Sequence, residues 1–385
     1  MADRYLDLMP RLVAAGLPPS STAALTVLRD IVDESAIGMS SRVTLALSLI
    51  GRIANEGKDP EAGFRAAVES ARFIEESPLA AAPVVAKALD WLLAEVADRP
   101  PDQRAAVLAE RAAQWAHETA WRRIALVAQA MAALEGIGTP LIADYSSTVA
   151  DIVSALADTE SLRLIVIPEG RVIDGGRRFV ETYETLGVPL RVVPDAAVDE
   201  AASLIDCVLM GAESVSCDGG IVDTIGAVVF ARAAMANGRP VYACADLLKV
   251  ATAAAECSTT TPESSPCLIE AELVVNTDSA RLETVPPSLV TAILTECGPL
   301  RPAEVATAAA AGLTPQAVGP ASSAVSCCGS ASTTWSSRAT VSTTARDTSC
   351  AVSPSCDSVE AMLAWCRKRF STPKSRTGTS TSASR

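Results

Sequence analysis

The spacing of apolar residues changes near Gly136, and this change limits the chain to a small set of folds. Residues 1–135 carry apolar side chains at helical spacing, in one helix after another. From residue 136 onward, short runs that are apolar throughout alternate with helical stretches. Such runs are typical of strands buried on both faces of a parallel sheet. We therefore predict an α/β fold, with an N-terminal all-helical domain followed by a Rossmann-like doubly wound parallel sheet.

Local signals mark the start of two helices in the first part. Asp59 precedes Pro60, which predicts a capped helix start, and Asp102 starts another helix after a pair of prolines. The spacing in this second helix predicts a mostly one-sided apolar face. That face holds Trp115, Trp121, Ile124, Val127 and Met131. The helix also holds His117, for which we expect a structural or surface position.

Six strands are predicted in the second part of the chain. They lie near residues 139–143, 162–167, 189–193, 206–210, 240–245 and 271–275. Helices are predicted between them at 147–157, 174–186 and 223–236. Asp174 is expected to cap the middle helix and Gly187 to end it. Ligands of such sheets bind at the carboxyl ends of the strands, so the loops after the strands hold the candidate site.

The charge and the ends of the chain exclude several classes of protein. The chain of 385 residues has a net charge of −13, and residues 316–385 hold eight Lys or Arg against three Asp or Glu. The acidic charge is therefore concentrated in residues 1–315, which disfavours direct binding to nucleic acid or to anionic membranes. No apolar run is long enough to span a membrane, and the N-terminus lacks the pattern of a signal peptide. We expect a cytoplasmic protein.

Cysteine and histidine usage points away from metal chemistry. No cysteine precedes Cys207, no Cys-x-x-Cys pair occurs, and His117 is the only histidine. A disulfide framework, a structural zinc site and a histidine-based catalytic triad are therefore not expected. We expect neither a metal nor a cofactor.

The chain is expected to divide into three parts. Residues 1–135 form the helical domain, and residues 136–315 form the Rossmann-like domain that binds the ligand. Residues 316–385 are rich in Ser and Thr and lack sustained periodicity. This tail is expected to be disordered or to be an out-of-frame extension.

Two loops carry groups suited to an anion. Ser146 or Ser147 could cap the next helix, and the N-terminus of that helix could then hold an anion; the alternative is a plain cap. Glu169 and Arg171 flank Gly170 after the second strand. A guanidinium matches the geometry of a phosphate, although a surface ion pair would explain these two residues equally well.

The remaining candidates follow the third, fourth and fifth strands. They are Asp195, Gly211, Ala212, Glu213, Gly219, Gly220, Asp223 and Lys249. Glycines allow the backbone to approach a ligand closely, and the lysine could add a positive charge. The glycines follow neither the Walker A pattern nor Gly-x-Gly-x-x-Gly. Together these residues predict a site for an anionic small molecule with carboxylates nearby.

Five segments occur in a characteristic order along the chain: Glu169–Arg171 with Gly176-Arg177, Val193–Ala197, Asp206–Gly226, Val241–Lys249 and Pro286–Glu304. Together they resemble one family: the regulatory α/β/δ subunits of translation initiation factor 2B and the related aldose-phosphate isomerases. Those isomerases act on ribose-1,5-bisphosphate and on methylthioribose-1-phosphate. The third segment is similar to the family signature of Gly-Ala-Asp/Glu, Asn-Gly-Asp/Gly and Asn-Lys-Ile-Gly-Thr. The resemblance covers residues 20–310 and is strongest from Pro140 onward.

The resemblance implies a helical domain on a Rossmann-like domain that dimerises, with a sugar-phosphate pocket at the strand ends. In the isomerases, a cysteine on the first loop and the aspartate of Gly-Ala-Asp carry the chemistry. This sequence departs from both, with Asp144 at the cysteine position and Glu213 at the aspartate position. Val32 stands where a phosphate-binding arginine is expected, and Asp223-Thr224 replaces Asn-Lys.

Two interpretations follow from the resemblance. In the first, the chain binds a small phosphorylated metabolite in a regulatory role, as a homodimer or larger homo-oligomer. In the second, it is an aldose-phosphate isomerase in which Asp144 and Glu213 form a rearranged carboxylate pair. Mutual repulsion would raise the pKa of one carboxyl of that pair, and the other could act as a general base. A different chemistry on the same scaffold is the remaining alternative.

Overall fold

The computed structural model describes residues 10–18, 38–143, 145–171, 175–251, 263–264, 278–279 and 282–312. Asp144, Asp174, residues 271–275 and the tail at 316–385 lie outside the described residues. The expectations for these residues therefore stay predictions, as does Val32 in the N-terminal loop.

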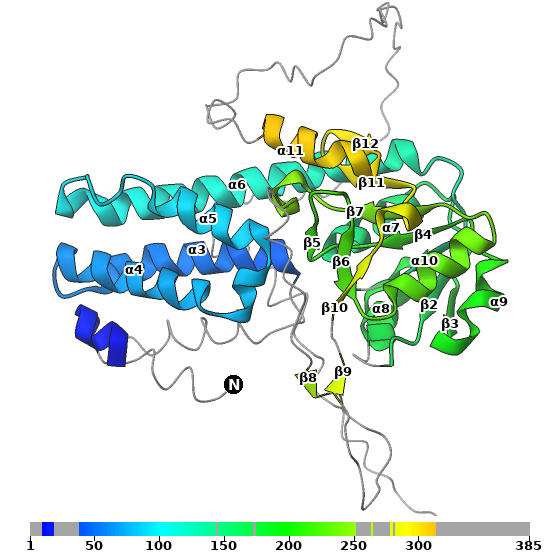
Figure 1. Cartoon of the computed structure of the whole chain (residues 1–385), viewed down its shortest axis with the longest axis horizontal. Helices are drawn as coiled ribbons and strands as arrows, with labels where there is room; N and C mark the ends of the chain where they lie inside the picture. The colour runs from blue at the N-terminus through cyan, green and yellow to red at the C-terminus, as the bar shows by residue number, and fades with distance from the viewer. Residues whose placement is uncertain are drawn as a thin grey trace, which may run out of the picture. The chain divides into compact units, whose positions relative to one another are not determined.

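The first part of the chain is helical, as predicted. Its main elements are α3 (Met39–Glu56), α4 (Pro60–Glu75), η1 (Pro78–Ala81), α5 (Pro83–Leu93) and α6 (Pro101–Ala133) (Figure 1). Asp59 caps α4 as predicted, because its carboxylate accepts a hydrogen bond of 2.7 Å from the amide of Ala62. Helices α3 and α4 cross closely, and a Cβ on Gly63 would lie 2.1 Å from the carbonyl oxygen of Ala54.

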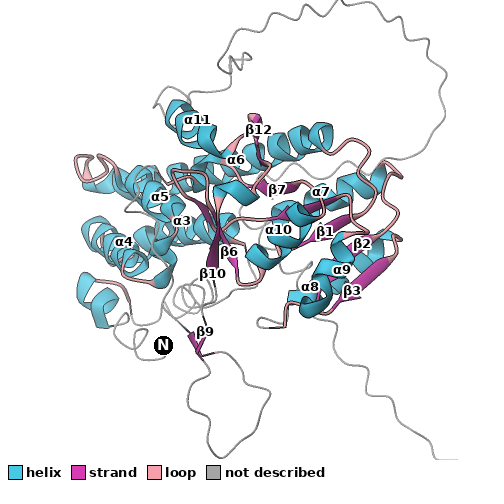
Figure 2. Ribbon diagram, turned by 45° about the vertical axis from the view of Figure 1, so that its right-hand side comes forward, coloured by secondary structure: helices cyan, strands magenta, loops and turns pink. Residues whose placement is uncertain are grey.

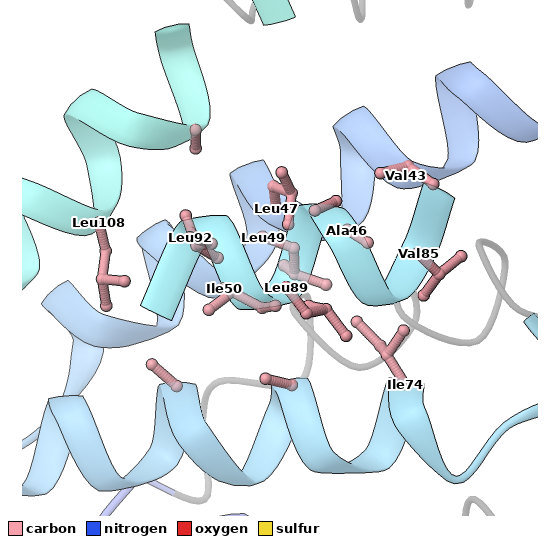
Figure 3. Close-up of a cluster of buried hydrophobic side chains, with 14 of the residues drawn as sticks. Val43, Ala46, Leu47, Leu49, Ile50, Ile74, Val85, Leu89, Leu92 and Leu108 are labelled. Atoms are coloured by element: carbon pink, nitrogen blue, oxygen red, sulfur yellow. The ribbon is translucent and has the colours of Figure 1, made fainter. Parts of the chain in front are cut away.

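A core of buried aliphatic side chains joins these helices (Figure 3). Leu47 and Ile50 of α3 meet Leu89 and Leu92 of α5, and Leu108 of α6 completes the cluster. The spacing of three residues places each of these two pairs on one helix face.

The prediction of an apolar face on α6 is wrong for the second half of the helix. Trp115 is buried, but Trp121 and Ile124 are 46% and 70% exposed. The buried face follows a helical repeat from Leu108 through Trp115, and the next position in phase is Arg122. The side chain of Arg122 is only 11% exposed. The buried face of the helix therefore continues with the charged Arg122, whereas the sequence had predicted that Trp121 and Ile124 would continue it.

The second part is a doubly wound sheet, as predicted. Its seven strands are β1 (Pro140–Ile142), β2 (Ile165–Pro168), β3 (Leu190–Val193), β4 (Cys207–Met210), β7 (Val241–Cys244), β11 (Ala292–Thr295) and β12 (Gly298–Leu300). They lie in the order β12-β11-β7-β4-β1-β2-β3, and all neighbours are parallel except β11 and β12. The reversal of strand order about β1 is the topological switch point of such a sheet.

Helices cover both faces of this sheet (Figure 2). They are α7 (Ser147–Asp158), α8 (Gly175–Tyr183), α9 (Val198–Ala202), α10 (Ala227–Ala236) and α11 (Val305–Gly312). Alternate residues of β4 enter two different cores: Val208 packs with α9, α10 and α11, whereas Leu209 packs with α7 and α8. Burial on both faces explains why these strands are apolar throughout.

Three features of the second part differ from the expectations. The helix predicted from residue 223 begins at Ala227, because β6 (Ile221–Thr224) pairs with β5 (Ser214–Val215) and β10 (Leu282–Val285) in a second, antiparallel sheet. Strands β11 and β12 had not been predicted. The helix expected at 174–186 is α8 followed by the 3-10 turn η2 (Glu184–Leu186), and Gly187 ends it in the left-handed conformation as predicted.

The described α6 also packs against β11, β12 and α7, so this helix contacts both parts of the chain. The division between residues 135 and 136 stays a prediction. Among the described helices, none is long and apolar enough to cross a membrane. A further pair of short strands, β8 (Glu263–Ser264) and β9 (Asp278–Ser279), forms a two-stranded ladder.

Candidate functional site at the strand ends

The loops after β1 and β4 are in contact. The hydroxyl of Ser146 accepts a hydrogen bond of 3.4 Å from the amide of Val149 and so caps α7. A Cβ on Gly211 would lie 2.6 Å from the Cβ of Ser146, so only glycine allows this approach. The fold thus brings together two predicted site residues from strands that neighbour each other in the sheet.

Ser147 contacts an arginine that the sequence had not singled out. Arg123 of α6 donates to the hydroxyl of Ser147 at 3.2 Å and to its carbonyl oxygen at 2.6 Å, and pairs with Asp151 at 2.5 Å. A Cβ on Gly38, the residue before α3, would lie 3.2 Å from the same hydroxyl. A guanidinium therefore lies at the N-terminus of α7, where the helix dipole also favours negative charge. Arg123 lies 24 residues before Ser147, and nothing in the local sequence signals the contact.

Glu169, Arg171 and Asp195 form a separate cluster at the ends of β2 and β3. The carboxylate of Asp195 accepts hydrogen bonds from the amides of Gly170 and Arg171, at 2.8 and 3.0 Å. Arg171 pairs with Glu169 at 3.1 Å, and the two side chains are 64% and 41% exposed. An exposed pair of this kind adds little stability, as expected for a surface ion pair. The two hydrogen bonds to Asp195 thus fix the backbone of the loop that follows β2.

Three carboxylates lie on or beside the second sheet. Glu213 directly precedes β5, and its amide donates to the carbonyl of Val222 at 2.9 Å, one residue before Asp223 in β6. Asp223 lies opposite Glu283 of β10 in the antiparallel ladder. Directly opposite residues of an antiparallel pair share one face, so the side chains of Asp223 and Glu283 are neighbours.

These three carboxylates differ in their surroundings. Asp223 is 2% exposed. One oxygen of Glu283 accepts from the amides of Gly226 and Val228, at 2.7 and 2.9 Å, at the start of α10. The Oε2 atom of Glu213 is buried and accepts no hydrogen bond from any described residue. Glu213 therefore keeps an acceptor available at the end of β4.

Lys249 brings a buried positive charge to the same place. It belongs to η4 (Leu247–Lys249), which follows β7, and its side chain is almost fully buried. Its Nζ donates to the carbonyl oxygen of Ala212 at 2.6 Å. Burial and the charge of Asp223 raise the pKa of the Cys244 thiol to about 12, while Lys249 acts in the opposite direction. The charges of Asp223 and Lys249 therefore both act on Cys244. A nearby negative charge offsets part of the cost of burying the Lys249 ammonium.

Gly219 and Gly220 form the turn between β5 and β6. Gly219 has a φ of +87°, and a Cβ there would lie 2.4 Å from the carbonyl oxygen of Pro302. The amide of Gly220 donates to Asp218 at 3.0 Å, and the hydroxyl of Ser216 donates to the same oxygen at 2.5 Å. Both glycines thus serve the turn and its packing on Pro302. A role in ligand binding stays a prediction for them.

The arrangement is suited to a polar anionic molecule. Ser146, Gly211, Ala212 and Lys249 meet at the ends of β1, β4 and β7, and the carboxylate of Glu213 follows β4 directly. The guanidinium of Arg123 adds a second positive charge beside Ser147. The proposed partner of Glu213, Asp144, lies outside the described residues.

Comparisons with known proteins support one family. The model of the Initiation factor 2 subunit family matches residues 38–302. The eIF2B subunit alpha of Dictyostelium discoideum is 24% identical over 213 residues, which cover 51% of this chain and 66% of that protein. The ribose 1,5-bisphosphate isomerase of Haloferax volcanii is 32% identical over 85 residues, which cover 22% of this chain and 26% of that protein. The chain thus spans less than two thirds of these relatives.

Solved structures show the same fold at low identity. The translation initiation factor eIF-2B of Pyrococcus horikoshii OT3 matches with a TM-score of 0.63 and 19% identity, covering 73% of this chain and 97% of that chain. The 5-methylthioribose 1-phosphate isomerase of the same organism matches with a TM-score of 0.61 and 18% identity, covering 74% and 87%. A chain of the tetrameric eIF2B-beta2-delta2 complex from C. thermophilum matches with a TM-score of 0.56 and 15% identity, covering 76% and 94%.

Proposed function

Because the chain belongs to the Initiation factor 2 subunit family, we propose that it binds a sugar-phosphate-type metabolite in a regulatory role. The pocket lies at the carboxyl ends of β1, β4 and β7. The observation that carries this proposal is the buried Lys249, whose ammonium group is fixed on the carbonyl of Ala212 next to Glu213. A buried lysine at a strand end supplies the charge that an anionic ligand needs.

The ligand-binding residues of this proposal are those that the sequence had indicated. They are Ser146, Ser147, Glu169, Arg171, Asp195, Gly211, Ala212, Gly219, Gly220, Asp223 and Lys249. The contact between Ser146 and Gly211 and that between Lys249 and Ala212 support the central group. We add Arg123 because it binds Ser147 at the start of α7. Glu169, Arg171 and Asp195 form the outer group, at the ends of β2 and β3, which lie two and three strands from β4.

The regulatory role rests on the charges of the site. Glu213 carries its carboxylate one methylene further than an aspartate would, and the buried Asp223 follows Val222, whose carbonyl accepts from the amide of Glu213. A displacement of about 1 Å in a reacting group can cost roughly a hundredfold in rate. The ammonium of Lys249 already donates to a backbone carbonyl. These features favour ligand binding without catalytic turnover.

The second candidate function is aldose-phosphate isomerisation by Asp144 and Glu213. One observation favours it: the Oε2 atom of Glu213 is buried and accepts no hydrogen bond from the described part of the chain. A carboxylate oxygen in that state is suited to take a proton from a bound sugar. Relatives named as isomerases are similar to this chain in sequence and in fold.

We propose that the protein acts in the cytoplasm, without a membrane or a nucleic acid as its direct partner, and as a homodimer or larger homo-oligomer. The tetrameric complex among the similar structures supports an assembly of this kind. The acidic residues 1–315 support the absence of nucleic-acid binding.

Phosphorus NMR of ribose 1,5-bisphosphate with the purified full-length chain tests both candidate functions. Shifted or broadened signals without conversion are expected for a regulatory pocket, and Lys249→Met should abolish them. Lys58→Met is the matched control, because Lys58 is an exposed lysine of the helical part. Conversion to a ketose bisphosphate that Glu213→Gln abolishes would establish the isomerase instead. Unchanged spectra would contradict both functions for this substrate class.

A further inference from the structure

The turn η4, which carries Lys249, lies where the core of the helical part meets one of the two cores that flank the sheet. Leu248 belongs to the core of the helical part, whereas Leu247 and Val250 belong to the core beneath the sheet. All three side chains are at least nine-tenths buried. A segment of four residues thus enters two cores, and its position depends on how each of them is packed.

The helical part holds η4 through a lysine of α5. The Nζ of Lys87 donates to the carbonyl oxygen of Leu248 at 3.3 Å and to that of Val250. These two carbonyls flank Lys249 on either side. Hydrogen bonds from a charged donor are stronger than those between neutral groups, and here one ammonium fixes the backbone on both sides of another lysine.

A second support comes from α6 through an ion pair. The carboxylate of Glu296, which directly follows β11, accepts from the amide of Leu247 at 3.1 and 3.3 Å and pairs with Arg122. The side chain of Glu296 is 3% exposed, so water cannot replace its partners. The inward position of Arg122, unexpected from the apolar pattern of α6, is explained by this contact.

A third support comes from Asp246, the residue before η4, and from Ser40 at the start of α3. Asp246 caps η4 by accepting a hydrogen bond of 3.0 Å from the amide of Leu248. The hydroxyl of Ser40 lies 3.5 Å from the second oxygen of Asp246. Each of α3, α5 and α6 thus places a polar side chain on η4 or on a residue that binds it.

We propose that Lys87 and Glu296 are positioning residues for Lys249, through which the helical part sets the geometry of the ligand site. The proposal rests on the proposed function only in taking Lys249 as part of that site. Lys87 fixes the backbone around Lys249, and the Arg122–Glu296 pair fixes the first amide of its turn. With both in place, the Lys249 ammonium is held on Ala212, beside Glu213. A shift of α5 would therefore change the binding site without any contact between α5 and the ligand.

The test measures Lys249 directly. Full-length wild type and variants are treated with acetic anhydride, and acetylation of each lysine is followed by peptide mass spectrometry. Lys87→Met and Glu296→Gln should raise the acetylation rate of Lys249 by at least about fivefold. Each variant removes a charged hydrogen-bond partner of the η4 backbone, so η4 should open locally more often. Lys87→Arg keeps the charge and the donors and should return the rate toward that of wild type.

Two control variants match these changes in chemistry. Glu118→Gln removes the other carboxylate that pairs with Arg122, at 2.8 Å, but its side chain makes no hydrogen bond to η4 among the described contacts. Lys58→Met removes an exposed ammonium of the helical part. Both should leave the acetylation rate of Lys249 within about twofold of wild type, as surface changes usually do.

Amide hydrogen exchange separates positioning from general loss of stability. In Lys87→Met and Glu296→Gln, exchange should accelerate at Leu247–Val250 and stay unchanged in α4. Equal acceleration in both places, or acetylation of Lys249 no faster than in the controls, would overturn the proposal. Because neither readout requires a ligand, failure of ribose 1,5-bisphosphate to bind wild type would contradict the proposed function and leave this comparison decisive.

Discussion

Buried charges define the site at the scale of single residues. Asp223 and Lys249 are 2% and 7% exposed and lie near the same thiol, that of Cys244. An isolated charge in such surroundings would be strongly destabilising, so opposite charges and hydrogen bonds must offset its desolvation. Charged residues that are buried to this extent point to a functional site, because folding alone would favour apolar side chains at these positions.

Thiol reactivity should follow burial. The pKa of Cys207 is raised by burial and by the charges around it, and that of Cys244 is raised to about 12, so both remain protonated at pH 8. Because the thiolate is the reactive form, iodoacetamide should modify the exposed Cys297 and leave the other two unmodified until the chain unfolds. Peptide mass spectrometry with and without urea measures this order. Rapid modification of Cys244 in the folded protein would show that the strand end is open to solvent.

Gly219 should tolerate no side chain. Its φ is +87°, and an added Cβ would lie 2.4 Å from the carbonyl oxygen of Pro302. Gly219→Ala should therefore lower the free energy of unfolding by about 2 kcal/mol or more. Gly238→Ala is the matched control, because Gly238 has a φ of +66° with no atom within 4 Å of the added Cβ. Urea titration compares the two, and equal losses would mean that backbone strain alone matters.

At the scale of elements, short polar contacts fix where helices and turns begin. Asp59 caps α4, Ser146 caps α7, and Asp246 caps η4, each by accepting from a backbone amide of the first turn. The last two caps lie at strand ends. The elements that surround the candidate site are therefore held by side chains of the same loops that would meet a ligand.

Removal of the α4 cap should weaken the helical part. Asp59→Ala leaves the amide of Ala62 without its hydrogen bond of 2.7 Å and should cost about 1 kcal/mol of stability. Asp102→Ala in the first turn of α6 is the control, because Asp102 makes no cap bond and contributes only through the helix dipole. Thermal unfolding followed by circular dichroism should show the larger loss for Asp59→Ala. A larger loss for Asp102→Ala would contradict the assigned cap.

The turn between β5 and β6 should contribute to acid sensitivity. Hydrogen bonds from Ser216 and from the amide of Gly220 lower the pKa of Asp218 below its value in the unfolded chain. The unfolded chain therefore binds more protons in this range, and the contribution is present above the unfolded pKa and lost as pH falls through the folded pKa. Asp218→Asn should reduce the difference in unfolding free energy between pH 6 and pH 3. Equal pH dependence in wild type and variant would contradict a role for this carboxylate.

At the scale of the whole molecule, α6 and η4 connect the helical part with the sheet. Helix α6 packs on α3 and α4 and also on β11 and β12, while η4 contributes side chains to the core of the helical part and to one of the cores that flank the sheet. Arg122 and Arg123 of α6 bind Glu296 and Ser147, which follow β11 and β1. The two parts are thus joined at the edge of the sheet where ligands bind in this architecture.

The full-length chain is expected to assemble with itself. Light scattering after size-exclusion chromatography should give at least twice the mass of one chain, and the mass should fall on dilution only below the dissociation constant. A single-chain mass at all concentrations would contradict the proposed homo-oligomer. The same run in the presence of ribose 1,5-bisphosphate would show whether the ligand changes the assembly.

The sequence by itself determined the fold class, most of the sheet and several helix ends. The change of period near Gly136 predicted helices followed by a doubly wound sheet, and Asp59 and Gly187 mark helix ends as expected. These signals are local: a cap, a left-handed glycine or an apolar run acts over a few residues, so it can be read from the chain alone. The order of motifs likewise indicated the family that the comparisons then showed.

Only the tertiary structure decided how distant charges pair. Arg123 binds Ser147 across 24 residues, Lys249 binds Ala212 across 37, and Arg122 binds Glu296 across 174. The second sheet, β5-β6-β10, depends equally on distant pairing, and it displaced the start of α10. Such contacts leave no periodic trace in the sequence, because the energy of a buried charge depends on partners that only the packing of separate elements brings together.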